Sequence, residues 1–149
     1  MGVLKLEIQN DLLKQTAASS RKPDTSHLAV IDTIRAAHLE CRVKPRSDLF
    51  KSCEMLSFDR DAAHAAYTES LVRHLPQILG KKPVLYRPGE PSLSFDEAWI
   101  LALLSAYGND DAPTKDFLLG SRVKHHYRLK MGFLCSNLAR LFGFGAHVS

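Results

Sequence analysis

The sequence predicts an all-α protein, a single-domain helical bundle of about five to seven helices over residues 1–149. Three observations support this prediction. Apolar residues recur at spacings of three and four along most of the chain. A capping box at 94–97 marks the start of one strongly apolar helix. Breaker residues concentrate at 80–92, a candidate internal boundary that includes a short extended segment near 83–87.

The first predicted element lies within residues 1–14, and two patterns compete there. The apolar residues from Leu4 to Ile8 alternate with polar ones, as in a strand, whereas the pair Leu12-Leu13 extends the run as a helix would. Residues 3–9 are therefore compatible with either a strand or a helix. We favour a helix because few other segments offer a strand partner. Residues 16–25 are small and polar and predict a loop.

Three helices are predicted next. The first covers 26–43, with apolar residues at helical spacing and an end imposed by Pro45. A short helix follows over 47–56. The third covers 59–79 and is rich in Ala, which favours helix. Its Pro76 should kink the helix or end it one residue earlier.

The clearest helix start of the chain is Ser94. Its hydroxyl can accept from the amide of Glu97, whose carboxylate can reach back to the amide of Ser94. The helix that follows carries Trp99 and is apolar on nearly every side, so we expect it to be central and buried. Gly108 begins the stretch that stops it.

The last predicted elements are a short helix near 114–120 and a helix over about 123–142. One stripe of the longer helix is apolar and should face the core. The opposite stripe is spaced at intervals of four and consists of Lys124, Arg128, Gly132, Ser136 and Arg140.

The net positive charge of the chain is concentrated in its last 33 residues. No Asp or Glu follows Asp116, whereas residues 1–116 are almost neutral, with 15 Lys and Arg against 16 Asp and Glu. A basic surface attracts phosphate, anionic lipid or an acidic protein. This pattern predicts seven residues that bind an anion or a partner: Arg122, Lys124, His125, Tyr127, Arg128, Lys130 and Arg140.

Two interpretations of this basic helix, residues 122–140, remain open. The preceding segment 90–116 has a net charge of −5, so the cations could be solvated or paired within the molecule. Alternatively, the cations could contact the phosphates of a nucleic acid while Tyr127 stacks on a base. A helix-turn-helix is disfavoured, because the connection after Gly108 is long and acidic. We favour the solvated or self-paired face and keep nucleic-acid binding as the alternative.

Metal binding and catalysis receive little support from the sequence. A zinc site would have to combine His38, Cys41, Cys53 and His64, but only the first two form a closely spaced pair, so we expect no metal and no cofactor. The chain contains no strained nucleophile turn and no glycine-rich phosphate loop. These patterns favour a non-catalytic protein over an enzyme.

The sequence therefore predicts a small protein that acts as a protein-interaction or regulatory module. A homodimer through an apolar helix face is compatible with it. Three widely spaced cysteines indicate free thiols in a reducing compartment, and no run of about 20 apolar residues predicts a membrane span. We accordingly expect a cytoplasmic location.

Overall fold

The computed structural model describes residues 25–43 and 59–145, and within them the chain is helical, with no strand. It forms α2 (Thr25–Val43), α4 (Arg60–Leu79), α5 (Phe95–Gly108), α6 (Ala112–Arg122), a 3-10 turn η1 (His125–Tyr127) and α7 (Arg128–Leu141). This confirms the all-α class. The helices predicted within 1–14 and over 47–56 lie outside the described residues.

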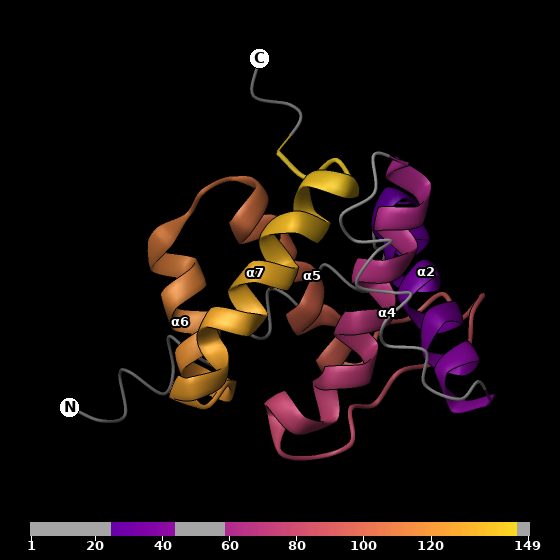
Figure 1. Cartoon of the computed structure of the whole chain (residues 1–149), viewed down its shortest axis with the longest axis horizontal. Coiled ribbons are helices and arrows are strands. Elements are labelled where there is room, and N and C mark those ends of the chain that lie inside the picture. Colours follow the sequence, from indigo (N-terminus) through magenta and orange to yellow (C-terminus); the bar gives the residue numbers. More distant parts are fainter. Residues whose placement is uncertain (1–24, 44–58, 146–149) are drawn as a thin grey trace.

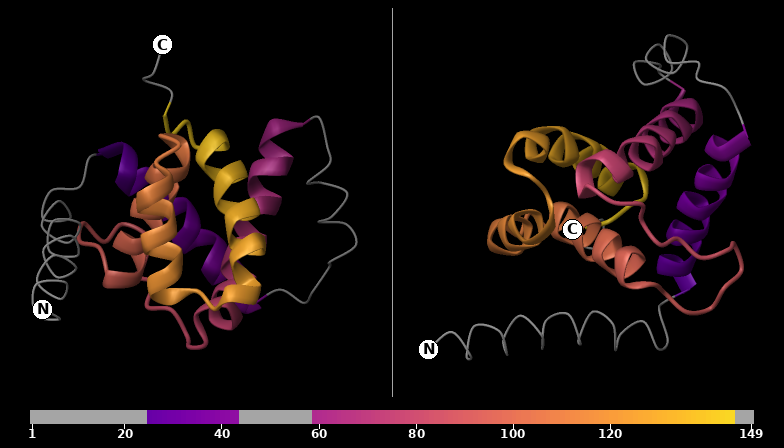
Figure 2. Two further views of the ribbon diagram at one scale, coloured as in Figure 1. Left: turned by 90° about the vertical axis from the view of Figure 1, so that its left-hand side faces the viewer. Right: turned by 90° about the horizontal axis from the view of Figure 1, so that it is seen from below.

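The helices pack in contacting pairs around α5 and α7 (Figure 1). α5 contacts α2, α6 and α7, while α4 contacts α2 and α7. The pair α2–α4 lies on one side of the molecule and α6 lies on the other, as the two further views show (Figure 2). The helix of Trp99 is thus central, as predicted, and Trp99 itself is only 2% exposed.

Helix ends follow the local chemistry of the sequence. The capping box is present as predicted, because Ser94 Oγ accepts from Glu97 N at 3.1 Å and Glu97 Oε1 accepts from Ser94 N at 2.9 Å. Asp59 caps α4, and Gly80 ends it in the left-handed conformation with φ of 73°.

One of the two alternatives for Pro76 was wrong, and the extended segment expected near 83–87 is not confirmed. Pro76 does not end its helix, which continues to Leu79. Pro76 is exposed, and the fully buried Ile78 holds the last turn against the core, so packing outweighs the lost backbone hydrogen bond. Residues 83–87 form no strand. They belong to a segment, 81–94, without a helix or strand of its own.

The C-terminal turn after α7 ties three helices together. The Phe142 ring meets His64 of α4 edge-on at 4.4 Å, and the Phe144 ring stacks on His27 of α2 at 5.7 Å. A Cβ added to Gly108 of α5 would lie 2.5 Å from Phe144 Cβ and 2.8 Å from its carbonyl carbon. The turn therefore depends on a glycine at the end of α5.

Gly108→Ala should lower the free energy of unfolding by about 1–3 kcal/mol, because the added methyl overlaps backbone that must then shift. Gly120→Ala is the matched control. Gly120 lies in α6 with no atom within 4 Å of an added Cβ, so alanine there should raise stability by up to about 1 kcal/mol. Urea unfolding of both variants measures the difference. Equal changes in the free energy of unfolding for Gly108→Ala and Gly120→Ala would contradict the close approach of Phe144 to Gly108.

Candidate functional site

The predicted basic helix over 122–140 is not a single helix. α6 ends at Arg122, Val123 is extended with φ of −105° and ψ of 124°, and α7 begins only at Arg128. Val123 is the physical reason for the break, since its side chain is buried, at 2% exposure. The helix predicted over about 123–142 is therefore corrected to Arg128–Leu141, and the basic residues are divided among three elements.

Arg122 is committed to the interior of the fold. Its guanidinium forms an ion pair with Asp96, and the two side chains are only 12% and 4% exposed. The guanidinium carbon lies 4.9 Å from the ring centre of Trp99 and 5.1 Å from that of Phe95. Asp96 also accepts from Val84 N at 2.7 Å. Arg122, which the sequence predicted to bind a partner, thus joins α6 to α5. Its ion pair with Asp96 is one case of the predicted pairing between the basic region and the acidic segment 90–116.

Two further predicted binding residues are partly withdrawn from solvent. Arg128 is half-buried, and its Nε donates to Val123 O at 3.0 Å, across the break between the helices. Tyr127 is half-buried against the core, and its ring lies 4.1 Å from the ring of His126. Neither side chain extends freely from the surface.

The remaining four predicted residues are exposed: Lys124, His125, Lys130 and Arg140. The ammonium group of Lys124 lies over the end of α4, 4.0 Å from the position of a Cβ built on Gly80. A cation there complements the partial negative charge at the helix end. Arg140 donates to Asn137 Oδ1 at 3.2 Å.

The exposed side of α7 differs from the predicted cationic stripe. It carries Leu129, Lys130, Phe133, Ser136 and Arg140, and we call this set the α7 face. Gly132, which the sequence placed on the cationic stripe, instead faces α5, where Tyr107 Oη would lie 2.7 Å from an added Cβ. The helix is rotated about its axis relative to the prediction.

The most informative members of the α7 face are apolar. Leu129 is 88% exposed and Phe133 is 55% exposed, and they lie four residues apart, one turn along the helix. The Phe133 ring touches Tyr67 of α4 at 5.8 Å between ring centres. Sequence reasoning missed both residues, although a signal existed, since both lie off the predicted apolar stripe.

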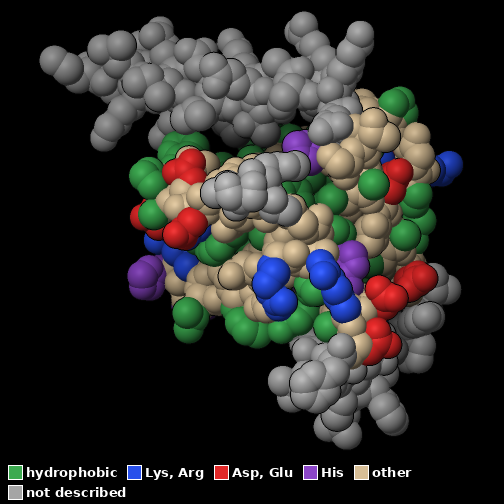
Figure 3. Space-filling view, turned by 90° about the horizontal axis from the view of Figure 1, so that it is seen from above, with side chains coloured by type: hydrophobic (Ala, Val, Ile, Leu, Met, Phe, Trp, Pro, Cys, Tyr) green, Lys and Arg blue, Asp and Glu red, His purple; other side chains and the backbone are tan. Residues whose placement is uncertain are grey.

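Exposed basic side chains lie near the start of α7. They come from the end of α4, from the linker after α6 and from η1, which meet at the lower end of α7 in Figure 1. We call this group the basic end, and it consists of Lys81, Lys82, Lys124, His125 and His126. The opposite end of the molecule, where α7 finishes, carries both cationic and acidic side chains (Figure 3).

A buried ion pair that sequence reasoning missed joins α2 to α5. Arg35 and Glu97 are both fully buried, with Nε to Oε2 at 2.7 Å and Nη2 to Oε1 at 2.8 Å. Arg35 also donates to the carbonyl oxygens of Glu90 and Ser92, each at 2.8 Å, and to Asp32 Oδ1 at 2.9 Å. The hydrogen bonds to Glu97 raise the pKa of Arg35 further above its usual value.

The geometry of this pair shows that it has a structural role. The five hydrogen bonds of Arg35 match the five N–H donors of a guanidinium. Glu97 accepts two bonds on each oxygen, from Arg35 and Ser94 N on Oε1 and from Arg35 and Tyr86 N on Oε2. Since no donor or acceptor is left over, the pair anchors the segment 81–94 and offers nothing to a substrate.

The residues nominated for zinc are not assembled by the described part of the structure. His38 and Cys41 lie on α2, His64 lies on α4, and Cys53 falls outside the described residues. Within residues 25–43 and 59–145, no three His, Cys, Asp or Glu side chains form a group able to hold a metal ion. Cys135 is fully buried, which raises the pKa of its thiol far above the usual value and keeps it protonated.

His64 is a half-buried imidazole. Its Nε2 is buried without a hydrogen-bond partner, and burial lowers the pKa of the ring, with a further contribution from the charge of Arg60. Burial also lowers the pKa of His38. Both rings are therefore held neutral in the folded protein near pH 7.

We expect the free energy of unfolding to fall as the pH drops below about 6.5, where unfolded histidines take up protons that the folded rings resist. The loss should level off once the pH passes below the folded pKa of His64. Urea unfolding at pH 7.5 and 5.5 measures this loss, which should be smaller in His64→Gln. Equal losses in the wild type and the variant would refute the contribution of His64.

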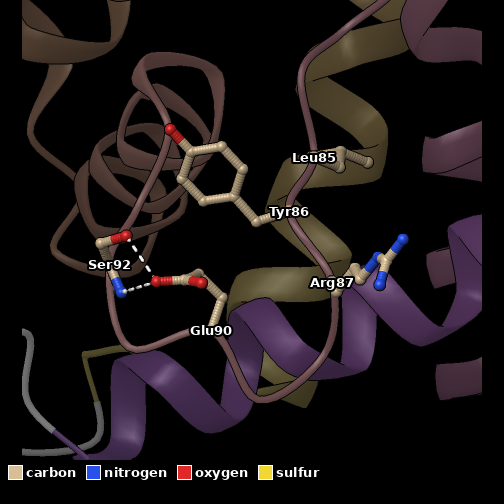
Figure 4. A pocket seen from close by; sticks show the side chains of 5 residues that line it. All are labelled: Leu85, Tyr86, Arg87, Glu90 and Ser92. Atoms are coloured by element: carbon tan, nitrogen blue, oxygen red, sulfur yellow. Dashed lines mark hydrogen bonds between the residues drawn. The ribbon is translucent and has the colours of Figure 1, made fainter.

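The segment 81–94 also borders an open hollow of about 440 Å³. Figure 4 shows its lining: Glu90 is hydrogen-bonded to Ser92 through both the amide and the hydroxyl, while the Arg87 side chain points away from Glu90. Its charged groups do not converge on one point, as the groups of a catalytic centre do.

Comparison with known proteins gives no relative for this chain: no family model, curated protein or solved structure matches it. Among the described residues, none of the helices is both long and apolar enough to cross a bilayer.

Proposed function

We propose that this chain is a non-catalytic, single-domain helical module that binds a protein partner through the α7 face. The observation that carries the proposal is the exposure of Leu129, at 88%, beside the half-exposed ring of Phe133. Two large apolar side chains one turn apart form a contiguous exposed patch on α7, and contiguous exposed apolar patches mark sites of protein interaction. The odd number of cysteines fits a reducing, cytoplasmic setting.

The polar interior supports a structural rather than a catalytic use of the buried charges. Arg35 and Glu97 satisfy each other and the neighbouring backbone, and Arg122 is paired with Asp96. The thiol of Cys135 is buried and protonated. The most reactive side-chain types of the described core are thus committed to folding.

Nucleic-acid binding receives less support than protein binding. Of the seven residues predicted to bind an anion or a partner, Arg122 is held in an ion pair with only 12% of its side chain exposed, and Tyr127 and Arg128 are half-buried. Phosphate contacts need cations and gain nothing from an exposed leucine beside them. The four exposed residues, from Lys124 to Arg140, remain available to either partner.

Photo-crosslinking in the native host tests the proposal. A photoreactive phenylalanine analogue at position 129 should give a discrete protein adduct on gel electrophoresis. The same analogue at Ala36, an exposed position on α2, should give none and serves as the control. The adduct should also disappear when Phe133→Ser is added. If position 129 gives no protein adduct, or if Ala36 gives the same one, the proposed function is wrong.

A further inference from the structure

We infer that the partner presents an acidic amphipathic helix, whose apolar side chains cover Leu129 and Phe133 and whose carboxylates meet the basic end. This inference rests on the proposed function and specifies the chemistry of the partner. The spacing of the apolar anchors and the charge that surrounds them carry it.

The spacing of the anchors favours a helical partner. Leu129 and Phe133 stand one turn apart, so they form a short apolar ridge along α7. Helices pack by fitting such ridges into the grooves between side chains of a facing helix. A partner helix with apolar residues three or four apart would therefore cover both anchors at once.

The charge around the anchors favours acidic side chains on that helix. Lys130 lies next to Leu129 on α7, and Lys124 lies across the end of α4, where Lys81 and Lys82 follow Gly80. The chain places no Asp or Glu after Asp116. The linker after α6, η1 and α7 therefore offer no carboxylate to these cations, and the carboxylates of an acidic helix would balance them.

The buried acids of α5 cannot supply this balance. Asp96 and Glu97, two of the six acidic residues of segment 90–116, are 3% and 0% exposed and are held by Arg122 and Arg35. Asp110 and Asp111 lie at the start of α6, where Asp110 pairs with Lys115 and Asp111 caps the helix, whereas Lys124 follows the end of α6. The basic end thus keeps its field, which can steer an acidic partner toward the anchors.

The same charges oppose a second copy of this chain as the partner. A twofold-symmetric contact through the α7 face would bring the Lys130 of one copy and the cations of the basic end toward the same residues of the other. Like charges at the rim of so small an apolar contact would weaken it. An acidic helix has no such penalty.

The test uses the full chain and a synthetic peptide of about 18 residues, with Leu along one face and Glu on the flanks, followed by fluorescence anisotropy. The peptide should bind, and its affinity should fall at least tenfold in Leu129→Ser/Phe133→Ser and in Lys124→Glu/Lys130→Glu. Arg60→Glu makes the same type of charge change at the start of α4 and should leave the affinity unchanged. Raising the salt concentration should weaken binding, and a peptide with Lys in place of Glu should not bind.

Several results would overturn the inference. The peptide could fail to bind, or bind equally well to the Leu129→Ser/Phe133→Ser variant. Tighter binding of duplex DNA, duplex RNA or phosphatidylserine vesicles, lost in the same variants, would assign the surface to those ligands. A dimer that dissociates on Leu129→Ser would assign it to a second copy. If position 129 gives protein crosslinks but the peptide does not bind, the inference of an acidic helix is wrong and the proposed function stands. If position 129 gives no protein crosslink, the proposed function itself is wrong.

Discussion

Glu97→Gln should lower the free energy of unfolding by about 3–5 kcal/mol, the usual cost of breaking a buried ion pair. The amide removes the buried counter-charge of Arg35, so that this fully buried guanidinium keeps only the partly exposed carboxylate of Asp32. In wild type both carboxylate oxygens of Glu97 accept hydrogen bonds, from Arg35, Ser94 N and Tyr86 N. Glutamine replaces one of these oxygens with an NH2 group, which is a donor and cannot accept a hydrogen bond from the donors that face it. The capping of α5 and the anchoring of segment 81–94 should weaken together.

Urea unfolding followed by circular dichroism measures this effect, with Glu69→Gln as the matched control. Glu69 pairs with Arg73 one turn away on α4, with both side chains partly exposed, so its loss should cost about 1 kcal/mol or less. Arg35→Lys provides an intermediate case if Glu97→Gln does not fold, since it keeps the charge and loses the forked geometry. A cost for Glu97→Gln no larger than that for Glu69→Gln would contradict the account of this pair.

Arg122→Ala should cost about 3 kcal/mol, the second-largest effect that we expect. The change leaves Asp96 as a nearly buried carboxylate that still accepts from Val84 N. It also removes a cation that lies close to the rings of Phe95 and Trp99. The packing of α6 on α5 should therefore loosen.

Lys130→Ala is the control for Arg122→Ala. Both changes remove one cation from the basic C-terminal region, but Lys130 is exposed on the α7 face, so its loss should change stability by no more than about 0.5 kcal/mol. Thermal and urea unfolding of the two variants make the comparison. Similar small effects from both changes would mean that Arg122 is a surface cation after all.

Local chemistry made several features predictable. The capping box of Ser94 and Glu97, the cap at Asp59 and the central burial of Trp99 all follow from residues that act within a few positions of one another. The all-α class follows from the same short-range spacings.

Features that depend on distant residues were not predictable in this way. Arg35 and Glu97 are 62 positions apart, and no residue near either of them in the sequence predicts that they pair. The break at Val123 arises because that side chain enters the core, and it separates Arg122 from the helix to which the sequence assigned it. The charge of the region was predictable, but which cations remain free was decided by tertiary packing.

The central claim is that the α7 face is free in the folded chain, and the stability of Leu129→Gln tests it most directly. Glutamine keeps helix propensity, so the free energy of unfolding should change by no more than about 0.5 kcal/mol, whereas Leu134→Gln, at a position 2% exposed, should cost several times more. A loss of about 2 kcal/mol or more in Leu129→Gln would mean that Leu129 packs against the chain itself, and the α7 face would not be available to a partner.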